Sequence, residues 1–270
     1  LPESMLPEVP AVLDAVLAVV SLVFTERSEA TVGDTLTRAY LCGEALRLGR
    51  LLVELLPEPD AVGLLALMLL HDSRRPARTS SDGSAVLLED QDRSLWDRAM
   101  ISEGIDLTQR ALASRRCGPY TIQAAISAVH SEAASSSVTD WAQIIALYDV
   151  LMRLQPSPVV ELNRAVAVAM GEGEERGLSL IDGLMGNGEL SDYYLAHSAR
   201  GALLGRLGRR DEAIAAYCTA RDLTDGPQRR FLVGRIAALR SEPGRSVTAG
   251  KAVRHSQKCQ LHVSFIPVRS

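Results

Sequence analysis

The sequence LLALMLLHDSRRPARTSSDGSAVLLEDQDRSLWD, residues 64 to 97, joins two predicted helices through a polar connection. Its apolar start, Leu64–Leu70, is typical of the end of a buried helix. Asp82-Gly83 lies between two short runs, and this dipeptide is a strong local signal for a tight hairpin turn. A hairpin over residues 76–89 would bring the basic residues before the turn back beside the acidic residues after it.

The polar connection contains many charged and aromatic side chains close together in the sequence, which could form a structural cluster or a contact site for a partner. We call this group the node. These node residues are His71, Asp72, Arg74, Arg75, Arg78, Glu89, Asp90, Asp92, Arg93 and Trp96. We expect Arg75 and Arg78 to neutralise the acidic run, and Asp92 (or Asp90) to cap a helix that begins at Arg93. The main role of the node would then be structural, as a clamp that holds the hairpin. Those of its side chains that remain exposed would be available to contact a partner.

An enzyme would use the same residues differently. A hydrolytic metal site would draw on His71, Asp72, Glu89, Asp90 and Asp92. The sequence has no H-E-x-x-H spacing and no second histidine clustered with His71, whereas capped and ion-paired carboxylates are common in proteins. We therefore expect no enzymatic activity, no metal site and no cofactor.

Composition and periodicity favour an all-α fold. Apolar residues make up 47% of the 270 residues and aromatic residues only 4%, a profile that favours helix over sheet. The predicted helices cover residues 11–24, 35–56, 61–71, 93–114, 120–133, 139–154, 157–170, 174–184, 192–207, 210–223 and 228–240. We predict a helical bundle with the hairpin over residues 1–118, continuous with helical repeats over 119–240. A basic tail, expected to be disordered, follows over 241–270.

The repetitive part of the sequence has features of tetratricopeptide-like (TPR-like) units. The clearest unit is His197–Pro227, in which small residues would allow two helices to cross closely and a large residue would fill the groove beside the next unit. These packing positions are Gly201, Leu207, Gly208, Ala213, Tyr217 and Ala220. They predict an α-solenoid in which neighbouring helix pairs share a continuous core.

Charge and cysteine content indicate partners and compartment. The formal net charge of the chain is −4. Residues 241–270 contain five Lys and Arg residues and one Glu, a net charge of +4. Residues 1–240 therefore carry −4 − 4 = −8. An acidic body does not attract nucleic acid, and we expect no direct DNA binding by this chain. The cysteines form no C-x-x-C pair, and no apolar run is long enough to span a bilayer. We expect a cytoplasmic protein without membrane contact, and, because the first residue is Leu1 rather than Met, a fragment or a processed chain.

Several blocks of the sequence recur together, in the same order, in a known family. The blocks are LCGEALRLGRLL (41–52), LLALMLLHDSRR (64–75), LLEDQDRSLWDRAM (87–100), GPYTIQAAISAVHSEA (118–133), TDWAQIIALYDVL (139–151) and SPVVELNRAVAVAM (157–170). From about Leu6 to Leu239, the chain resembles the C-terminal TPR-like extension of one group of bacterial extracytoplasmic-function (ECF) sigma factors of RNA polymerase. It departs from the family near Phe24, where FTERS stands in place of a pattern like FNEGY, and sigma regions 2 and 4 are absent.

The resemblance implies a role in the regulation of transcription initiation. The chain would act on sigma regions 2 and 4 of the same full-length protein and, through them, on the RNA polymerase core and promoter DNA. An additional, unidentified protein partner is also compatible with this role. The sequence leaves one alternative open, a stand-alone TPR adaptor that binds a peptide or protein in its concave groove.

Overall fold

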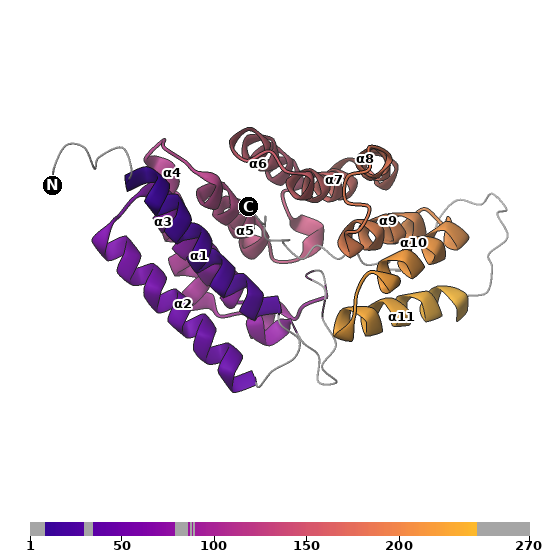
Figure 1. Cartoon of the computed structure of the whole chain (residues 1–270), viewed down its shortest axis with the longest axis horizontal. Helices are drawn as coiled ribbons and strands as arrows, with labels where there is room; N and C mark the ends of the chain where they lie inside the picture. Colours follow the sequence, from indigo (N-terminus) through magenta and orange to yellow (C-terminus); the bar gives the residue numbers. More distant parts are fainter. Residues whose placement is uncertain (1–8, 30–34, 79–85, 87, 89, 242–270) are drawn as a thin grey trace. The chain divides into compact units, whose positions relative to one another are not determined.

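The described part of the chain is all-helical and forms two compact units in a computed structural model (Figure 1). The structure describes residues 9–29, 35–78, 86, 88 and 90–241, and every regular element within them is a helix, which confirms the predicted all-α fold. The first unit contains the described residues up to Ala77 together with Asp92–Gln155. The second contains Arg78–Gln91 and the described residues from Pro156 onward.

Two predicted segments lie largely or wholly outside the described residues. The hairpin over 76–89 includes residues 79–85, 87 and 89, which the structure does not describe, and the tail prediction concerns residues after 241. At the base of the predicted hairpin, the backbone N–H of Val86 donates to the carbonyl oxygen of Arg78 over 2.8 Å. This hydrogen bond joins the two sides of the segment before and after Asp82-Gly83.

Helix α3 is the central element of the first unit. The α-helices of this unit are α1 (Val9–Glu29), α2 (Thr35–Leu55), α3 (Pro59–Asp72), α4 (Arg98–Ala113), α5 (Pro119–Glu132) and α6 (Trp141–Leu154). Helix α3 packs against α1, α2, α4 and α5. Because it has neighbours on several sides, every residue from Ala61 to Leu70 is buried, as expected for a helix that is apolar around its whole circumference.

The start of α4 differs from the prediction. Helix α4 begins at Arg98, because the carboxylate of Asp97 accepts hydrogen bonds from two backbone N–H groups of its first turn, at 2.9 and 3.0 Å. Asp92 caps only the one-turn 3-10 helix that begins at Arg93. Between these two caps Trp96 has an extended backbone, with ψ 137°, and this separates the two helical segments.

We expect Asp97→Ala to lower the free energy of unfolding more than Asp92→Ala does. Removing the N-cap of a regular α-helix typically costs about 0.5–2 kcal/mol, whereas Asp92 orders a single exposed turn. Chemical denaturation of both variants measures the difference. Asp90→Ala, an exposed change in the same acidic run, is the control, and equal losses for Asp97→Ala and Asp92→Ala would contradict this assignment of the caps.

Residues 119–155, which the sequence analysis grouped with the helical repeats of 119–240, lie in the first unit together with Asp92–Gly118. Helix α5 belongs to the first unit because it packs against α3, α4 and α6. The carboxylate Oδ1 of Asp60 on α3 accepts hydrogen bonds from the backbone N–H of Thr121 (2.8 Å) and from its Oγ1 (3.1 Å). Helix α3 therefore provides a polar partner for the first turn of α5, and this contact, distant in sequence, ties residues 119–132 to the front of the chain.

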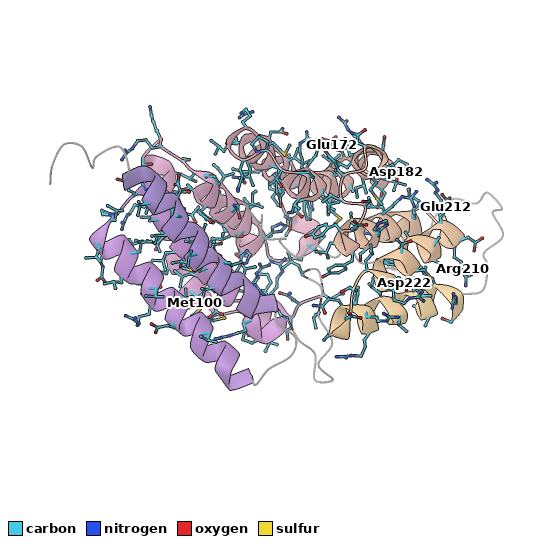
Figure 2. All side chains as sticks on the ribbon, viewed as in Figure 1. Met100, Glu172, Asp182, Arg210, Glu212 and Asp222 are labelled. Atoms are coloured by element: carbon cyan, nitrogen blue, oxygen red, sulfur yellow. The ribbon has the colours of Figure 1, made fainter. Side chains whose placement is uncertain are left out.

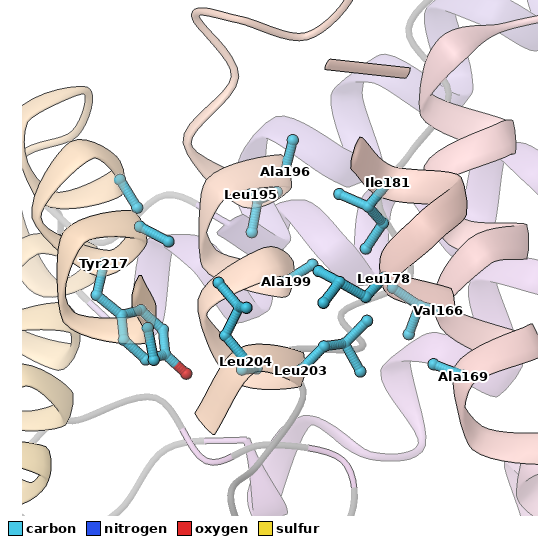
Figure 3. Packing of buried hydrophobic residues seen from close by; sticks show 14 of the residues in the cluster. Val166, Ala169, Leu178, Ile181, Leu195, Ala196, Ala199, Leu203, Leu204 and Tyr217 are labelled. Atoms are coloured by element: carbon cyan, nitrogen blue, oxygen red, sulfur yellow. The ribbon is translucent and has the colours of Figure 1, made fainter. Parts of the chain in front are cut away.

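The second unit is a series of helices in which each packs against the next. Its helices are α7 (Pro158–Glu172), α8 (Glu174–Gly186), α9 (Tyr194–Arg206), α10 (Arg210–Asp222) and α11 (Gly226–Ser241). Helix α7 also contacts α9. Figure 3 shows how side chains from α7, α8, α9 and α10 meet in one buried cluster. No single helix pair forms this core, so neighbouring helices depend on one another for burial.

The α9–α10 pair contains the packing positions predicted from the sequence. A Cβ atom at Gly201 would lie 3.1 Å from the ring of Tyr217 and 3.2 Å from the carbonyl oxygen of Ala213, so glycine allows the close crossing. Tyr217 is 1% exposed. The remaining positions are Leu207, the C-cap of α9, Gly208, whose φ of +73° favours glycine, and the buried Ala220.

Charged side chains on the second unit form local ion pairs. Figure 2 labels four acidic members, and the pairs are Glu172 with Arg176 (2.9 Å), Asp182 with Arg200 (2.6 Å), Glu212 with Arg209 (2.6 Å) and Asp222 with Arg221 (2.8 Å). Exposed pairs of this kind contribute at most about 1 kcal/mol each. The buried cluster, rather than these pairs, therefore accounts for the stability of the unit.

Candidate functional site

The polar connection between α3 and α4 contains one buried tryptophan, Trp96, which belongs to the first unit. Trp96 is 3% exposed. The guanidinium carbon of Arg93 lies 4.4 Å from its ring centroid and that of Arg74 lies 5.9 Å away, both within the range of cation–π attraction. We call the group Arg74, Arg93, Trp96, His130 and Trp141 the Trp96 cluster.

Arg93 joins this connection to the end of α5. Its Nη1 donates hydrogen bonds to the carbonyl oxygens of His130 (2.9 Å) and Ala133 (2.5 Å). Carbonyl groups in the last turn of a helix have no partner within the helix, and a cation there is also favoured by the helix dipole. Arg93 therefore acts as a C-terminal cap for α5, supplied by a residue distant in sequence.

His130 is the buried titratable member of the Trp96 cluster. It packs edge-on against Trp141 of α6, with 5.3 Å between ring centroids and 73° between ring planes. Burial, followed by the positive charges of Arg74 and Arg93, lowers the pKa of His130 to about 3. The imidazole is therefore neutral near pH 7, and in this state it connects α5 to α6 by packing rather than by charge.

The last turn of α3 supplies two more polar contacts. Asp72, which is buried, pairs with Arg75 across 3.4 Å, whereas the sequence predicted that Arg75 would pair with the acidic run after the turn. His71 Nε2 lies 3.2 Å from Ser127 Oγ on α5. The ion pair is local, three residues apart, and the His71 contact links α3 to α5.

The structure divides the predicted node residues into groups. His71, Asp72, Arg74, Arg75, Asp92, Arg93 and Trp96 belong to the first unit, Arg78 and Asp90 belong to the second, and Glu89 lies outside the described residues. The predicted clamp across the turn is thus only partly described. The contacts given above run from the end of α3 and from Arg93 to α5.

Sequence reasoning did not include three residues of this site. Ser127, His130 and Trp141 lie on α5 and α6, far in sequence from the predicted node, and none of them is among the node residues. The one sequence signal for Ser127 and His130 is the periodicity of residues 120–133, which places these two residues near one face of a helix. Nothing in the sequence indicates that this face meets α3.

The arrangement is suited to fixing the α3–α4 connection rather than to covalent chemistry. Trp96 Nε1 is buried and has no hydrogen-bond partner among the described residues, so aromatic and cation–π contacts hold the ring. Within the same residues, no group of three or more His, Cys, Asp or Glu side chains lies close enough to hold a metal ion. None of the helices in the described ranges is long and apolar enough to cross a membrane.

Comparisons with known proteins found one family and one relative, and the description of neither states an activity. Residues 12–112 match a family described as a family of unknown function (DUF6596). The chain is also similar to an uncharacterized protein of Rhizobium meliloti (strain 1021), with 47% identity over 234 residues. This alignment covers 86% of the chain and 55% of the relative, so the chain spans about half the length of that protein. A search of solved structures gave no match.

Proposed function

We propose that this chain is the regulatory C-terminal domain of an ECF sigma factor and modulates transcription initiation through protein–protein or interdomain contacts. The observation that carries the proposal is where the family-like blocks fall in the fold. Block 64–75 forms most of α3 and its last polar turn, block 87–100 contains Arg93 and Trp96, and block 118–133 forms α5. With block 139–151, which contains Trp141, four of the six blocks include the residues of the Trp96 cluster, whereas block 41–52 lies on α2 and block 157–170 on α7 of the second unit.

The length of the Rhizobium meliloti relative supports a role as one part of a larger protein. The region similar to this chain occupies 55% of that relative, so the relative contains substantial further sequence. In this proposal, that further sequence supplies sigma regions 2 and 4, which contact the RNA polymerase core and promoter DNA. The domain described above would then control how those regions engage their targets.

Electrostatics favour action through protein contacts. Residues 1–240 carry a net charge of −8, by the arithmetic given above. Several exposed arginines are also paired with carboxylates in their own unit, including Arg47 with Glu44 and Arg209 with Glu212. Binding to DNA depends mainly on cationic side chains that neutralise phosphates. We therefore expect this chain to lack sequence-selective binding to duplex DNA at physiological salt.

The decisive experiment compares the full-length Rhizobium meliloti relative with its matched region alone. We expect the full-length protein to co-purify with core RNA polymerase and to direct transcription from a promoter, and the matched region alone to do neither. Failure of the full-length relative to bind core polymerase would overturn the proposal.

A stand-alone TPR adaptor is the second candidate. The observation that favours it is the series of paired helices in the second unit, with Gly201 against Tyr217 at a close crossing, because arrays of this kind present extended binding surfaces. An adaptor would bind a peptide or protein without core polymerase. Polymerase binding separates the two candidates. The regulatory domain of a sigma factor predicts that the full-length relative binds core polymerase and that the same protein without its additional region does not. An adaptor predicts no polymerase binding by either protein.

A further inference from the structure

Helix α11 is the last helix that the structure describes, and its packing within the second unit is one-sided. It packs chiefly against α10, beside which Figure 1 shows it, whereas α9 packs against both α8 and α10. The side of α11 that faces the core supplies Leu232, Ile236 and Leu239, which are at most 7% exposed. The residues on its other side, among them Arg230 and Arg240, are exposed.

A groove that is open to solvent lies between α10 and α11. Arg221 of α10 lines one side of it, and Val233, Ile236, Ala237 and Arg240 of α11 line the other. The groove has a volume of about 440 Å³, which is in the range of sites that hold a small ligand or a few side chains. Val233 is 49% exposed and Ile236 only 4%, so the groove has an apolar floor beside a partly exposed apolar wall.

The charge of α11 is opposite to that of the chain before it. Its sequence, GPQRRFLVGRIAALRS, contains four arginines and no acidic residue. Residues 1–240 carry −8, so residues 1–225 carry −8 − 4 = −12. Arg230 and Arg240 form no ion pair among the described residues, and both side chains are exposed. Their guanidinium groups are therefore free to accept a carboxylate from another molecule.

Arg230 and Arg240 flank the apolar part of the exposed helix surface. Successive members of the set Arg230, Val233, Ala237 and Arg240 are three, four and three residues apart, so they lie along one face of α11. At a rise of 1.5 Å per residue, the two arginines are about 15 Å apart along the helix axis. This face is therefore apolar in its middle and positively charged at both ends.

We infer that the groove between α10 and α11 binds an acidic peptide segment of a protein partner, with an apolar side chain in the groove and carboxylates on Arg230 and Arg240. A carboxylate can form a bidentate pair with a guanidinium group, and such charge-assisted pairs are strong and directional. An apolar side chain over Ile236 removes apolar surface of both molecules from water. The segment therefore has Asp or Glu residues on both sides of Leu, Ile or Val.

Charge and shape argue against other occupants of this groove. A second copy that used the same helix would place arginine opposite arginine, and residues 241–270, which carry +4, would meet the same repulsion. A nucleic acid would be repelled by the −12 of residues 1–225 and gains little from an apolar floor. A fatty acid needs an enclosed cavity to bury its chain, whereas this groove is open to solvent.

The first test is the binding of a fluorescein-labelled synthetic peptide in which pairs of glutamates alternate with pairs of leucines. Fluorescence anisotropy at physiological salt measures the dissociation constant of this peptide from the full chain. We expect saturable binding with a roughly micromolar dissociation constant, and we expect added salt to weaken it because the paired charges are near the surface. Replacing the leucines by serines, or the glutamates by lysines, should each weaken the binding by about tenfold or more.

Two variants of the chain locate the binding site. Arg240→Glu should weaken binding of the glutamate–leucine peptide by about tenfold, because a repulsive charge replaces an attractive one. Val233→Ser should weaken it by about fivefold through the loss of apolar contact. Both side chains are exposed, so the fold should tolerate the changes. Arg110→Glu is the matched control, because Arg110 is an exposed arginine of the first unit without an ion pair among the described residues, and this variant should bind as the unmodified chain does.

Several outcomes would overturn the inference. Absence of saturable binding at chain concentrations up to about 1 mM excludes a site for acidic peptides, and binding that neither Arg240→Glu nor Val233→Ser weakens places the site elsewhere. Equal binding of the lysine–leucine peptide indicates a purely apolar surface, and equal binding of the glutamate–serine peptide indicates an unselective effect of charge. A dimer in sedimentation that Arg240→Glu dissociates makes a second copy the occupant.

The inference goes beyond the proposed function, because it assigns a ligand chemistry that suits a sigma-factor domain and an adaptor alike. The assays use only this chain and synthetic peptides. Their results are therefore independent of whether the full-length relative binds RNA polymerase.

Discussion

Lowering the pH from 6.5 to about 4.5 is expected to destabilise the first unit by more than it destabilises the same unit of a His130→Phe variant. The pKa of His130 in the folded protein is about 3, against an ordinary value of 6.5. Between these values the unfolded chain binds a proton that the native protein excludes. The stability associated with the neutral ring is therefore complete above pH 6.5 and is lost progressively as the pH falls toward 3.

The size of this effect follows from proton linkage. One proton bound only by the unfolded chain contributes up to about 1.4 kcal/mol per pH unit, so the difference between the two proteins should approach roughly 2–3 kcal/mol at pH 4.5. Phenylalanine retains an aromatic ring against Trp141 but cannot titrate. Both tryptophans, Trp96 and Trp141, belong to the first unit. Tryptophan fluorescence during urea unfolding at several pH values therefore reports on that unit.

His197→Gln is the control for the pH experiment. His197 lies in the second unit, where its Nε2 is 2.7 Å from the carbonyl oxygen of Ser191. Its replacement should leave the pH dependence of the tryptophan signal as in the unmodified protein. Parallel pH profiles for the unmodified protein and His130→Phe would contradict the prediction, because they would mean that His130 binds its proton equally in both states.

The second large effect is expected at Gly63, where the backbones of α3 and α5 approach closely. A Cβ atom at Gly63 would lie 2.6 Å from the backbone N and Cα of Thr121. Backbone atoms of a packed helix move only together with the helix, so Gly63→Ala should push α5 away from α3. Overpacking of this kind costs about 1–3 kcal/mol, and we expect a loss in this range by tryptophan fluorescence.

Gly43→Ala is the matched control for Gly63→Ala. Both glycines lie inside helices, but a Cβ atom at Gly43 meets no other atom within 4 Å. Alanine is preferred over glycine inside a helix by roughly 0.5–1 kcal/mol, so Gly43→Ala should be neutral or stabilising. A neutral Gly63→Ala variant would mean that the two helices are further apart than described.

The Gly63 crossing also positions the candidate functional site. It fixes α5 against α3, and the contacts between His71 and Ser127 and between Arg93 and the His130 carbonyl both depend on that position. We therefore expect Gly63→Ala to alter the environment of Trp96 as well as the stability. A shift in the tryptophan emission of the folded variant, absent from Gly43→Ala, would indicate this coupling.

Local sequence features determined the helical content and most helix positions. The predicted segments 139–154, 157–170 and 210–223 correspond closely to α6, α7 and α10. These positions follow from apolar periodicity, from capping residues such as Asp140 and Ser157, and from prolines and glycines at the connections. Such signals act over a few residues, which is why a single sequence contains them.

The tertiary structure alone decided which residues meet. The sequence analysis assigned the cap to Asp92 (or Asp90), and the extended backbone of the buried Trp96 moves the start of α4 to Arg98, where Asp97 is the cap. Likewise, the roles of Arg93 at the end of α5 and of Asp60 at its start depend on the approach of α3 to α5. These contacts join residues far apart in the chain, and their energies depend on helix packing, which no local pattern specifies.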